Sequence, residues 1–481
     1  MIKNDKYQVV IGLEVHAQLL TKSKIFSSDS AAFGAAPNTN ISPITLAHPG
    51  TLPKMNKQAI EFAVKLGLAL NCDIEQDNYF ARKNYFYPDL PKGYQVSQHT
   101  TPICKNGIVT IKVGDVERNI RLNRIHMEED AGKSLHDIDE NYTSIDLNRA
   151  GVPLLEIVSE PDMHSSEEAF AYVTVLRRLV RWLNICDGNM EEGSMRCDAN
   201  ISIRLKGETK LGTRVEVKNL NSIRNVKRAI DLEVDRLIDI VEKGEKVLQQ
   251  TRSYDADKNT TFALRSKEEA DDYRYFADPD LTPFNISDEF LHRIKAELPA
   301  LPDELEKKYK TEYNLPDYGA QVICGDKALV EFFEAIILHT SNYKAAVNWL
   351  MGPVKSYLNE NNIEITDFPL SPEKISSLIQ LVDSGKVNFS VASSKIFTNL
   401  LAAPDKTPLQ IATALNLLQD SDGGAVEAWV DEVINNMPDK VKEYKSGKKG
   451  LIGLFVGEVK KLSKGKADMN LVNKLLVEKL N

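Results

Sequence analysis

The sequence predicts an α+β fold in which an antiparallel sheet precedes a helical C-terminal region. Up to about residue 295, short runs of alternating apolar and polar residues are separated by turn-forming residues, as in half-exposed strands. Beyond that point, apolar residues recur at intervals of three and four, as in VEFFEAIILHT and YKAAVNWLMGPVKSYL. Two amphipathic segments, FAYVTVLRRLVRWLNI and SIRNVKRAIDLEVDRLIDIVEKGE, are expected to form helices that cover one side of the sheet.

Prolines mark the predicted domain boundaries. Four of them, at positions 279, 283, 299 and 302, punctuate the segment that follows the strand-rich part. The stretch LAAPDKTP, residues 401–408, interrupts the helical pattern a second time. Because 481 residues are too many for one ordinary core, two or three domains are expected, and the two interruptions favour three. They are a sheet-containing body over 1–295, a helical connector over 296–410 and a helical tail over 411–481.

Composition excludes several classes of protein. No apolar run approaches the roughly 18 residues that span a bilayer, and the N-terminus, MIKNDKYQVV, lacks the apolar core of a signal peptide. The five cysteines form no CxxC pair, so neither a zinc ribbon nor a disulfide framework is expected. We expect a reducing, cytoplasmic location instead. The formal net charge of −9 argues against a wholly basic nucleic-acid binder but is compatible with a local basic patch.

Three predicted strands carry acids, amides and a histidine on their polar faces. Side chains alternate between the two faces of a strand, so VIGLEVHAQL, RCDANISIRL and RVEVKN each separate an apolar face from a polar one. The residues on the polar faces are Glu14, His16 and Gln18; Asp198, Asn200, Ser202 and Arg204; and Glu216 and Lys218. Half-buried antiparallel strands always have a polar face. A functional site and an ordinary solvated face are therefore both compatible with this pattern.

The segment RIHMEEDAGK, residues 124–133, places Glu128, Glu129 and Asp130 among basic residues. It is compatible with a solvated loop or with a cation site. Carboxylates on one surface repel each other unless a cation separates them, and Mg²⁺ prefers oxygen ligands. The acids Glu14, Glu129, Glu156 and Glu216, with His16, would suit Mg²⁺, or Mn²⁺ because imidazole is present. For His16 alone, a structural hydrogen bond is equally compatible.

Basic residues lie near these acidic motifs and could contact phosphate, although structural salt bridges are the alternative for most of them. They are Arg82, Lys83, Lys92, Arg124, Lys133, Arg149, Arg196 and Lys218. The sequence AGKS at 131–134 is not a phosphate-binding P-loop, because Met127 stands where that motif requires glycine. Any phosphoryl chemistry must therefore use a site on the sheet.

Several long motifs resemble those of the B-subunit family of the tRNA-dependent, aspartyl/glutamyl-tRNA(Asn/Gln) amidotransferases. They are IGLEVHAQL, RKNYFYPDLPKGYQVSQ, RIHMEEDAGK, DLNRAGVPLLEIVSEPD, MEEGSMRCDANISI, EVKNLNSIRNVKRAI, DDYRYFADPDL, NWLMGPV and LFVGEVKKLSKGKADMNLVNKLL. The resemblance covers essentially the whole chain. It implies a cradle domain similar to the glutamine synthetase core, over the body predicted above.

The resemblance also implies a two-step ligase reaction. ATP phosphorylates the side-chain carboxylate of Glu-tRNA(Gln) or Asp-tRNA(Asn), and ammonia then displaces the phosphate to leave the amide. The ammonia is implied to come through a channel from an amidase-type glutaminase, which is the family's A subunit, in a heterotrimer completed by a small C subunit. Which of the two aminoacyl-tRNAs is used, or whether both are, stays open.

Carried over by motif, the expected catalytic and metal-binding set is Glu14, His16, Glu129, Glu156 and Glu216, with Glu128 and Asp198 in reserve. Lys83, Lys92, Arg149 and Lys218 are expected at the ATP phosphates or at the mouth of the ammonia tunnel. The expected cofactor is Mg²⁺, with Mn²⁺ as an alternative and ATP as a substrate. Some family members hold a cysteine-bound zinc, but zinc is not expected here because the five cysteines lack paired spacing.

The C-terminal stretch is basic. From Lys440 to the end there are 11 lysines and four acids, a local charge of +7. Lysines on a solvated helical surface would explain this, and so would contact with RNA phosphates. The resemblance favours the second interpretation, because the family's helical and tail domains grip tRNA. The expected tRNA contacts are Lys448, Lys449, Lys460, Lys461, Lys464 and Lys466.

Two other functions compete with this interpretation. One is a stand-alone carboxylate–amine ligase or metallohydrolase that uses the same acidic face on a small substrate. The basic tail and the lack of any glutaminase motif argue against it. The other is a tRNA-binding scaffold without catalytic activity, in which the acids of the sheet could be replaced without chemical consequence.

Overall fold

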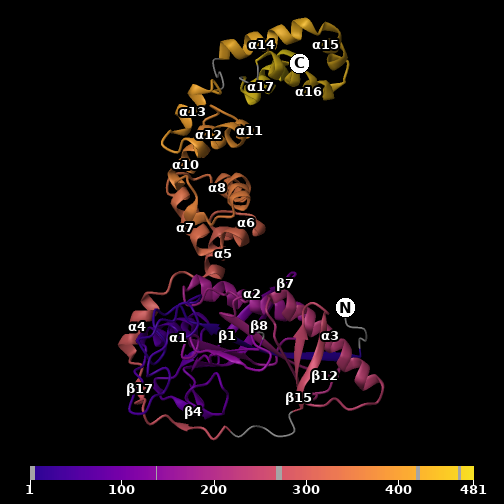
Figure 1. Cartoon of the computed structure of the whole chain (residues 1–481). Helices are drawn as coiled ribbons and strands as arrows, with labels where there is room; N and C mark the ends of the chain where they lie inside the picture. Colours follow the sequence, from indigo (N-terminus) through magenta and orange to yellow (C-terminus); the bar gives the residue numbers. More distant parts are fainter. Residues whose placement is uncertain (1–5, 137, 267–272, 419–422, 464–466, 481) are drawn as a thin grey trace. The chain divides into compact units, whose positions relative to one another are not determined.

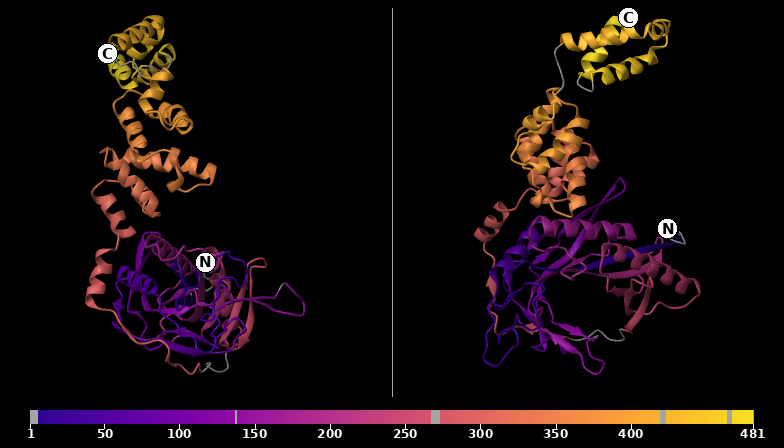
Figure 2. Two further views of the ribbon diagram at one scale, coloured as in Figure 1. Left: turned by 60° about the vertical axis from the view of Figure 1, so that its left-hand side comes forward. Right: turned by 45° about the horizontal axis from the view of Figure 1, so that its top comes forward.

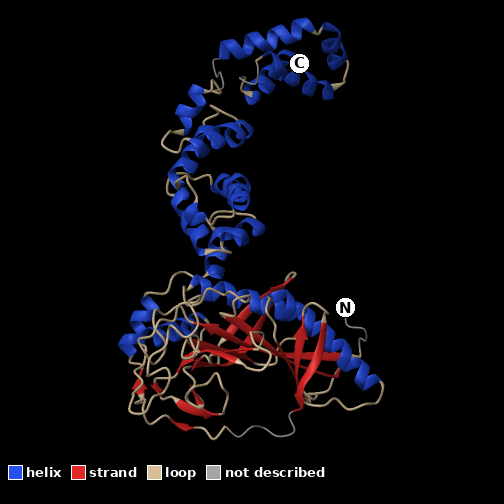
Figure 3. Ribbon diagram, in the orientation of Figure 1, coloured by secondary structure: helices blue, strands red, loops and turns tan. Residues whose placement is uncertain are grey.

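The computed structural model describes residues 6–136, 138–266, 273–418, 423–463 and 467–480 (Figure 1). The chain divides into two compact units, Met1–Leu301 and Pro302–Asn481. The first contains the strands and the second is built from helices in its described part (Figure 3). None of the helices in the described ranges combines the length and the apolar composition that a membrane span requires. The prediction of an α+β fold with a helical C-terminal region is confirmed.

The described residues of the first unit form a ten-stranded sheet. Its order is β15-β14-β13-β12-β1-β11-β8-β6-β2, with β7 paired to β8 outside this path. Neighbouring strands are antiparallel except for the parallel pair β13–β14. The strands are β1 (Tyr7–Gln18), β2 (Asp73–Ile74), β6 (Cys104–Lys105), β7 (Ile108–Val113), β8 (Val116–Glu129), β11 (Pro153–Ser159), β12 (Met195–Leu205), β13 (Val215–Lys218), β14 (Gln250–Asp255) and β15 (Thr260–Ser266).

The alternation in the sequence explains which face of the sheet is buried. On β1, Leu13, Val15 and Ala17 are buried, whereas the residues between them are half-exposed. On β13, Val215 and Val217 are fully buried and the residues that follow each of them are not. Apolar side chains thus fill one face of the central strands, and the predicted polar face lies on the opposite side.

Two long helices lie on the same side of the sheet (Figures 1 and 2). They are α2 (Ser166–Trp182) and α3 (Ile223–Glu242), and they pack against each other. Helix α2 also packs against β7, and α3 packs against β12. Ser165 and Ser222 cap their N-termini by accepting hydrogen bonds from the amides of Glu168 and Asn225. The prediction of two helices covering one side of the sheet is confirmed.

Smaller elements surround the sheet. Three short strands form a second sheet in the order β16-β4-β5, which joins the segment around residue 276 to residues 81–97. The remaining elements of this unit are β3 (Asp77–Asn78), β4 (Ala81–Asn84), β5 (Tyr94–Ser97), β9 (Lys133–Leu135), β10 (Ser144–Asp146), β16 (Phe276–Ala277), β17 (Phe284–Asn285), α1 (Lys57–Ala69) and α4 (Asp288–Ala296).

The second unit begins at Pro302 and consists of short helices. Its first α-helices are α5 (Pro302–Thr311), α6 (Asp317–Ile323), α7 (Lys327–Ile337), α8 (Tyr343–Trp349), α9 (Lys355–Asn361), α10 (Pro372–Asp383), α11 (Phe389–Val391), α12 (Phe397–Ala402) and α13 (Pro408–Ala414). The last four are α14 (Gly423–Asn436), α15 (Pro438–Lys445), α16 (Ile452–Leu462) and α17 (Met469–Leu480). These four share an apolar core that includes Val430, Phe455 and Leu476. The division of 296–481 into a connector and a tail stays a prediction.

Candidate active site

The register of four central strands brings polar residues from distant segments into adjacent positions. On β1, Glu14 lies opposite Asp198 of β12, and His16 lies opposite Glu156 of β11. Glu156 in turn lies opposite His126 of β8. Paired residues of an antiparallel sheet project from the same face. Their side chains therefore meet on the face opposite the apolar core.

One group on this face consists of His16, Glu128 and Glu156, whose ligand atoms all lie within 4.8 Å of one another. The Nε2 atom of His16 lies 3.4 Å from a carboxylate oxygen of Glu156. Both acids are buried, although buried carboxylates are rare unless they are paired or bind a cation. Two carboxylates and an imidazole at this spacing form a donor set that suits a divalent cation such as Mg²⁺ or Mn²⁺.

Further side chains hold Glu128 in place. The hydroxyl of Ser97 donates a hydrogen bond to one oxygen of Glu128 over 2.7 Å, and the amide of Gln95 donates to the other over 3.2 Å. The Nε2 atom of His126 lies 3.1 Å from Glu128 and 3.6 Å from Glu156. Such contacts fix the orientation of groups that bind metals. Neither Ser97 nor His126 was assigned a role from the sequence. His126 could have been found, because alternation on its strand places it on the same face as Glu128.

A second group shares His16 and adds Glu14 and Asp198. Lys218 lies beside it and forms ion pairs with Asp198 and Glu216, the latter at 3.0 Å. Thr251 donates a further hydrogen bond to Glu216 over 2.8 Å. Glu216 therefore faces the same side as predicted, and Lys218 links it to Asp198.

The protonation of these groups reflects their mutual contacts. Burial alone would lower the pKa of His16, but the hydrogen bond to Glu156 and the charges of Glu156 and Glu14 raise it to about 9. Burial and the neighbouring charge of Glu156 raise the pKa of Glu14. Burial alone would raise the pKa of Glu128, but contact with His126 lowers it well below the usual range. The site thus holds carboxylates of unequal proton affinity around a histidine that is protonated at neutral pH.

The structure corrects the placement of Glu129. It was expected to share a face with Glu14, His16, Glu156 and Glu216, but consecutive residues of β8 project to opposite sides of the sheet. The carboxylate of Glu129 pairs with Lys92 and accepts a hydrogen bond from the amide of Val96 over 2.8 Å. Glu128, predicted only as a reserve, occupies the expected place.

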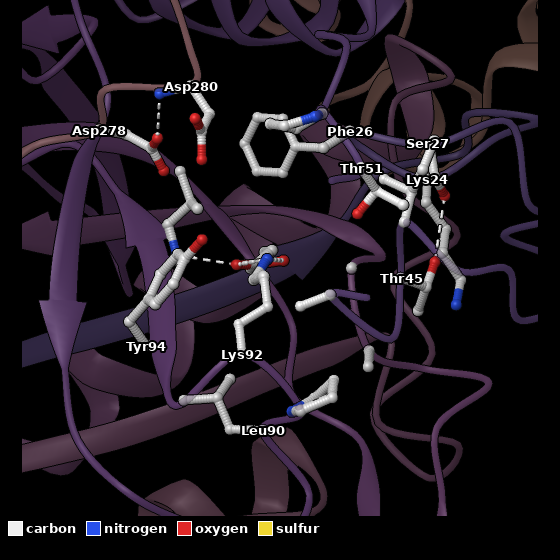
Figure 4. Close-up of a pocket in the computed structure, with 18 of the residues that line it drawn as sticks. Lys24, Phe26, Ser27, Thr45, Thr51, Leu90, Lys92, Tyr94, Asp278 and Asp280 are labelled. Atoms are coloured by element: carbon white, nitrogen blue, oxygen red, sulfur yellow. Dashed lines mark hydrogen bonds and ion pairs between the residues drawn. The ribbon is translucent and has the colours of Figure 1, made fainter. Parts of the chain in front are cut away.

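Glu129 and Lys92 instead line a separate cavity of about 310 Å³ (Figure 4). The Lys92 ammonium points toward the Glu129 carboxylate, between the rings of Phe26 and Tyr94 at 5.7 and 5.5 Å. Lys24 also lines this cavity, and burial lowers its pKa to about 8. The cavity is therefore polar: besides Lys24 and Lys92, it is lined by Arg82 and by four acids, Glu129, Asp130, Asp278 and Asp280.

The other predicted cations occupy different surroundings. Lys83 lies on β4, where the charges of Glu128 and Glu156 raise its pKa although burial acts against them. Arg149 donates hydrogen bonds to the carbonyl oxygens of Ala131 and Gly132, at 2.9 and 2.7 Å, and so anchors the loop after β8. Its Nε atom also lies 3.7 Å from a carboxylate oxygen of Asp130, and these contacts agree with the structural alternative for Arg149.

The predicted tRNA-binding lysines lie in the second unit. Four of them, Lys448, Lys449, Lys460 and Lys461, are exposed. Lys448 and Lys461 form ion pairs with Glu443 and Glu458 at 3.0 and 2.6 Å. Lys464 and Lys466 lie outside the described residues.

Comparison with known proteins identifies the family. Residues 9–292 match the model of the "GatB/GatE catalytic domain", and residues 331–480 match that of the "GatB domain". A protein from Bdellovibrio bacteriovorus is 48% identical over 475 residues, covering 98% of this chain and 99% of its own. One from Pelodictyon phaeoclathratiforme is 49% identical over 475 residues, and one from Persephonella marina 47% over 476, each covering at least 99% of both chains. All three are named as the B subunit of aspartyl/glutamyl-tRNA(Asn/Gln) amidotransferase.

The sheet with its acidic face thus belongs to an enzyme of the ligase-type amidotransferase class. More particularly, the chain belongs to the B-subunit family of the aspartyl/glutamyl-tRNA(Asn/Gln) amidotransferases, which the sequence motifs predict.

Proposed function

We propose that the acidic face of the sheet activates and amidates the side-chain carboxylate of Glu-tRNA(Gln), Asp-tRNA(Asn) or both. In the first step, a carboxylate oxygen of the aminoacyl group attacks the γ-phosphorus of ATP and ADP leaves. In the second, ammonia attacks the acyl carbon of the acyl phosphate and inorganic phosphate leaves, which gives Gln-tRNA(Gln) or Asn-tRNA(Asn).

The observation that carries this proposal is the convergence of His16, Glu128 and Glu156 with Glu14 and Asp198 on one face. Transfer of phosphate to a carboxylate brings two anions together, so positive charge must be concentrated where they meet. The first three residues would hold Mg²⁺ or Mn²⁺, and Glu14 with Asp198 provides oxygen ligands beside them. When bound, the divalent ion would neutralise charge on the phosphate oxygens.

Two lysines of the chain supply further positive charge. Lys218 lies at the Glu14–Asp198 end of the face through its ion pairs with Asp198 and Glu216. Lys83 lies near the other end of this face, where the charges of Glu128 and Glu156 raise its pKa. We assign both lysines to the neutralisation of the phosphate groups, which agrees with the raised pKa of each.

The cavity around Lys92 and Glu129 is our candidate for the end of the ammonia path. The acyl phosphate reacts with water, so ammonia must reach it through a passage that excludes bulk solvent. The lining of this cavity includes Glu129, the last residue of β8, and Asp130, which follows it and accepts a hydrogen bond from Gln18 of the polar face over 2.6 Å. The proposed source of ammonia is a glutaminase, the A subunit of a heterotrimer that also contains a small C subunit.

We further propose that the exposed lysines of the C-terminal helices bind tRNA. Lys448, Lys449, Lys460 and Lys461 are all exposed, and exposed ammonium groups can reach phosphates without a sequence code. Double-helical RNA is recognised mostly by shape and by contacts to the sugar–phosphate backbone. Selection among tRNAs would then depend on shape and on particular exposed bases.

The test supplies the purified chain with ammonium chloride, ATP, Mg²⁺ and either Glu-tRNA(Gln) or Asp-tRNA(Asn). Amide formation is expected with wild type and not with Glu128→Gln or Glu14→Gln. Glu117→Gln is the matched control, because Glu117 is an exposed acid on the same strand as Glu128.

The competing functions give different results in this assay. A catalytically silent scaffold would bind tRNA without forming amide in wild type. A stand-alone ligase would form amide on a free amino acid or another small carboxylate but not on aminoacyl-tRNA. Equal activity in wild type and Glu128→Gln would contradict the assignment of the acidic face.

A further inference from the structure

Lys83 is placed beside the acidic face without an ion pair of its own. It lies on β4, and its ammonium is 5.0 Å from the ring centroid of Tyr273 and 5.9 Å from that of Tyr85. Within the described ranges, no hydrogen bond and no carboxylate within ion-pair distance is found for this ammonium. Lys92 and Lys218, by contrast, are each bound to acids. Aromatic faces are thus the described contacts of the Lys83 ammonium.

The two rings come from segments that are far apart in the chain and are fixed to each other. The ring centroids of Tyr85 and Tyr273 lie 6.1 Å apart at an angle of 67°, a favourable edge-to-face arrangement. The amide of Asn84 donates to the carbonyl oxygen of Tyr273 over 3.0 Å, and its side chain donates to that of Arg274 over 2.8 Å. The segment that carries Tyr273 is therefore tied to the strand that carries Lys83.

Further rings extend this arrangement. Tyr275 lies 6.1 Å from Tyr273 between centroids and stacks on His99 at 4.1 Å and 9°. Burial raises the pKa of Tyr275, and its neighbours Lys83 and Glu128 act on it with opposite signs. The ring cluster is thus continuous from Lys83 to His99 and close to the acidic group that contains Glu128.

A cation over the face of a ring keeps its positive charge, whereas an ion pair largely cancels it. We propose that Tyr85 and Tyr273 are positioning residues that hold the Lys83 ammonium near Glu128 and Glu156 but outside ion-pair distance of them, ready for an anionic group of the substrate. This inference rests on the proposed function, in which that anion is the transferred phosphate. It assigns to the rings a role in orienting charge, in addition to packing.

The first test does not depend on catalysis. Acetic anhydride modifies accessible lysine ammonium groups through their neutral form, and mass spectrometry follows the modification of Lys83. Replacement of the ring in Tyr273→Leu is expected to accelerate modification of Lys83 several-fold, while Tyr273→Phe, which keeps the ring, stays near wild type. The control is Tyr87→Leu, because the Tyr87 ring contacts Tyr85, is 59% exposed and has no described contact with Lys83. An unchanged rate in Tyr273→Leu would overturn the proposed contact.

The second test uses the ammonium-dependent amidation assay. Tyr273→Leu should lower kcat/KM by about 3- to 30-fold, the range expected for a cation–ring contact, and Tyr273→Phe should restore it. In a Lys83→Met background, Tyr273→Leu should cost almost nothing further, because the charge that the ring positions is absent. An equal penalty in both backgrounds, or a Phe variant as impaired as Leu, would show that the ring has a different role. Absence of amidation in wild type would refute the proposed function instead, and the labelling result would still stand.

Discussion

Two adjacent acids on β8 offer a matched test of where the divalent cation binds. Glu128 belongs to the group with His16 and Glu156, whereas Glu129 projects to the other side and pairs with Lys92. Exchange of either acid for glutamine removes one negative charge with almost no change of shape. We predict that Glu128→Gln weakens Mn²⁺ binding strongly and that Glu129→Gln leaves it within about threefold of wild type, since only the first removes a proposed ligand charge.

The expected magnitude follows from the number of groups that contact the site. Loss of an outer partner of a metal ligand typically costs about 10- to 100-fold in affinity. Glu128 supplies one of three converging ligand atoms, so its loss should cost at least about 100-fold, or about 2.7 kcal/mol at 25 °C. Electron paramagnetic resonance of free Mn²⁺ measures this affinity directly, and circular dichroism checks that both variants are folded.

The opposite ranking would refute the reasoning. If Glu129→Gln lost Mn²⁺ and Glu128→Gln kept it, the cation would bind in the cavity around Lys92, and the alternation argument for β8 would be wrong. Equal, small effects of both substitutions would place the cation away from this strand altogether.

Four further predictions concern separate parts of the chain. Because the pKa of His16 is about 9, above the usual 6.5, its imidazole is protonated at neutral pH, and a metal ion must displace the proton to bind there. Calorimetry at pH 7.5 in buffers of different ionisation enthalpy should therefore show release of about one proton per Mn²⁺ bound. Binding without proton release would contradict this prediction. The side chain of Glu233 is 0% exposed and contacts Arg236, Arg252 and Thr261. Urea titrations should therefore show that Glu233→Ala lowers the free energy of unfolding by about 3–5 kcal/mol. A loss of less than about 1 kcal/mol would contradict this prediction. Phe455→Ala should cost a similar amount, about 3–5 kcal/mol, but hydrogen exchange should accelerate in α14, α16 and α17 and not in the central sheet. The double variant Lys460→Glu and Lys461→Glu should weaken tRNA binding and make the slope of log K against log salt concentration about 1–2 less steep. An unchanged slope would show that these lysines do not contact tRNA.

Much of the first unit could be predicted from the sequence because strand periodicity is a local signal. The apolar and polar faces of β1, β12 and β13 follow from alternation alone. The amphipathic patterns of α2 and α3 likewise indicated both helices and the side they bury. The family was evident from long motifs distributed over the whole chain, and the comparisons confirm it.

The composition of the acidic group could be predicted only in part, because it depends on register between distant strands. Nothing local shows that His16 lies opposite Glu156, or that Glu156 lies opposite His126. The choice between Glu128 and Glu129 was a different matter. Alternation with the buried Ile125 and Met127 places Glu129 on the apolar side, whereas the motif by itself does not distinguish the two adjacent acids.

The aromatic surroundings of Lys83 had no signal in the sequence. Tyr85 is two residues from Lys83, but Tyr273 reaches it through the pairing of β16 with β4. This pairing joins segments that are far apart in the chain and involves two residues of each strand. Strands this short lack a periodic pattern, so tertiary contacts decide where they pair.

Crystals of the protein soaked in Mn²⁺ would test the central claim most directly, through the anomalous signal of the ion. We predict a peak bounded by Nε2 of His16 and the carboxylates of Glu128 and Glu156, which disappears in crystals of Glu128→Gln. A peak at Glu129 and Lys92, or no peak in crystals of protein that amidates aminoacyl-tRNA, would contradict the assignment of this face as the metal site.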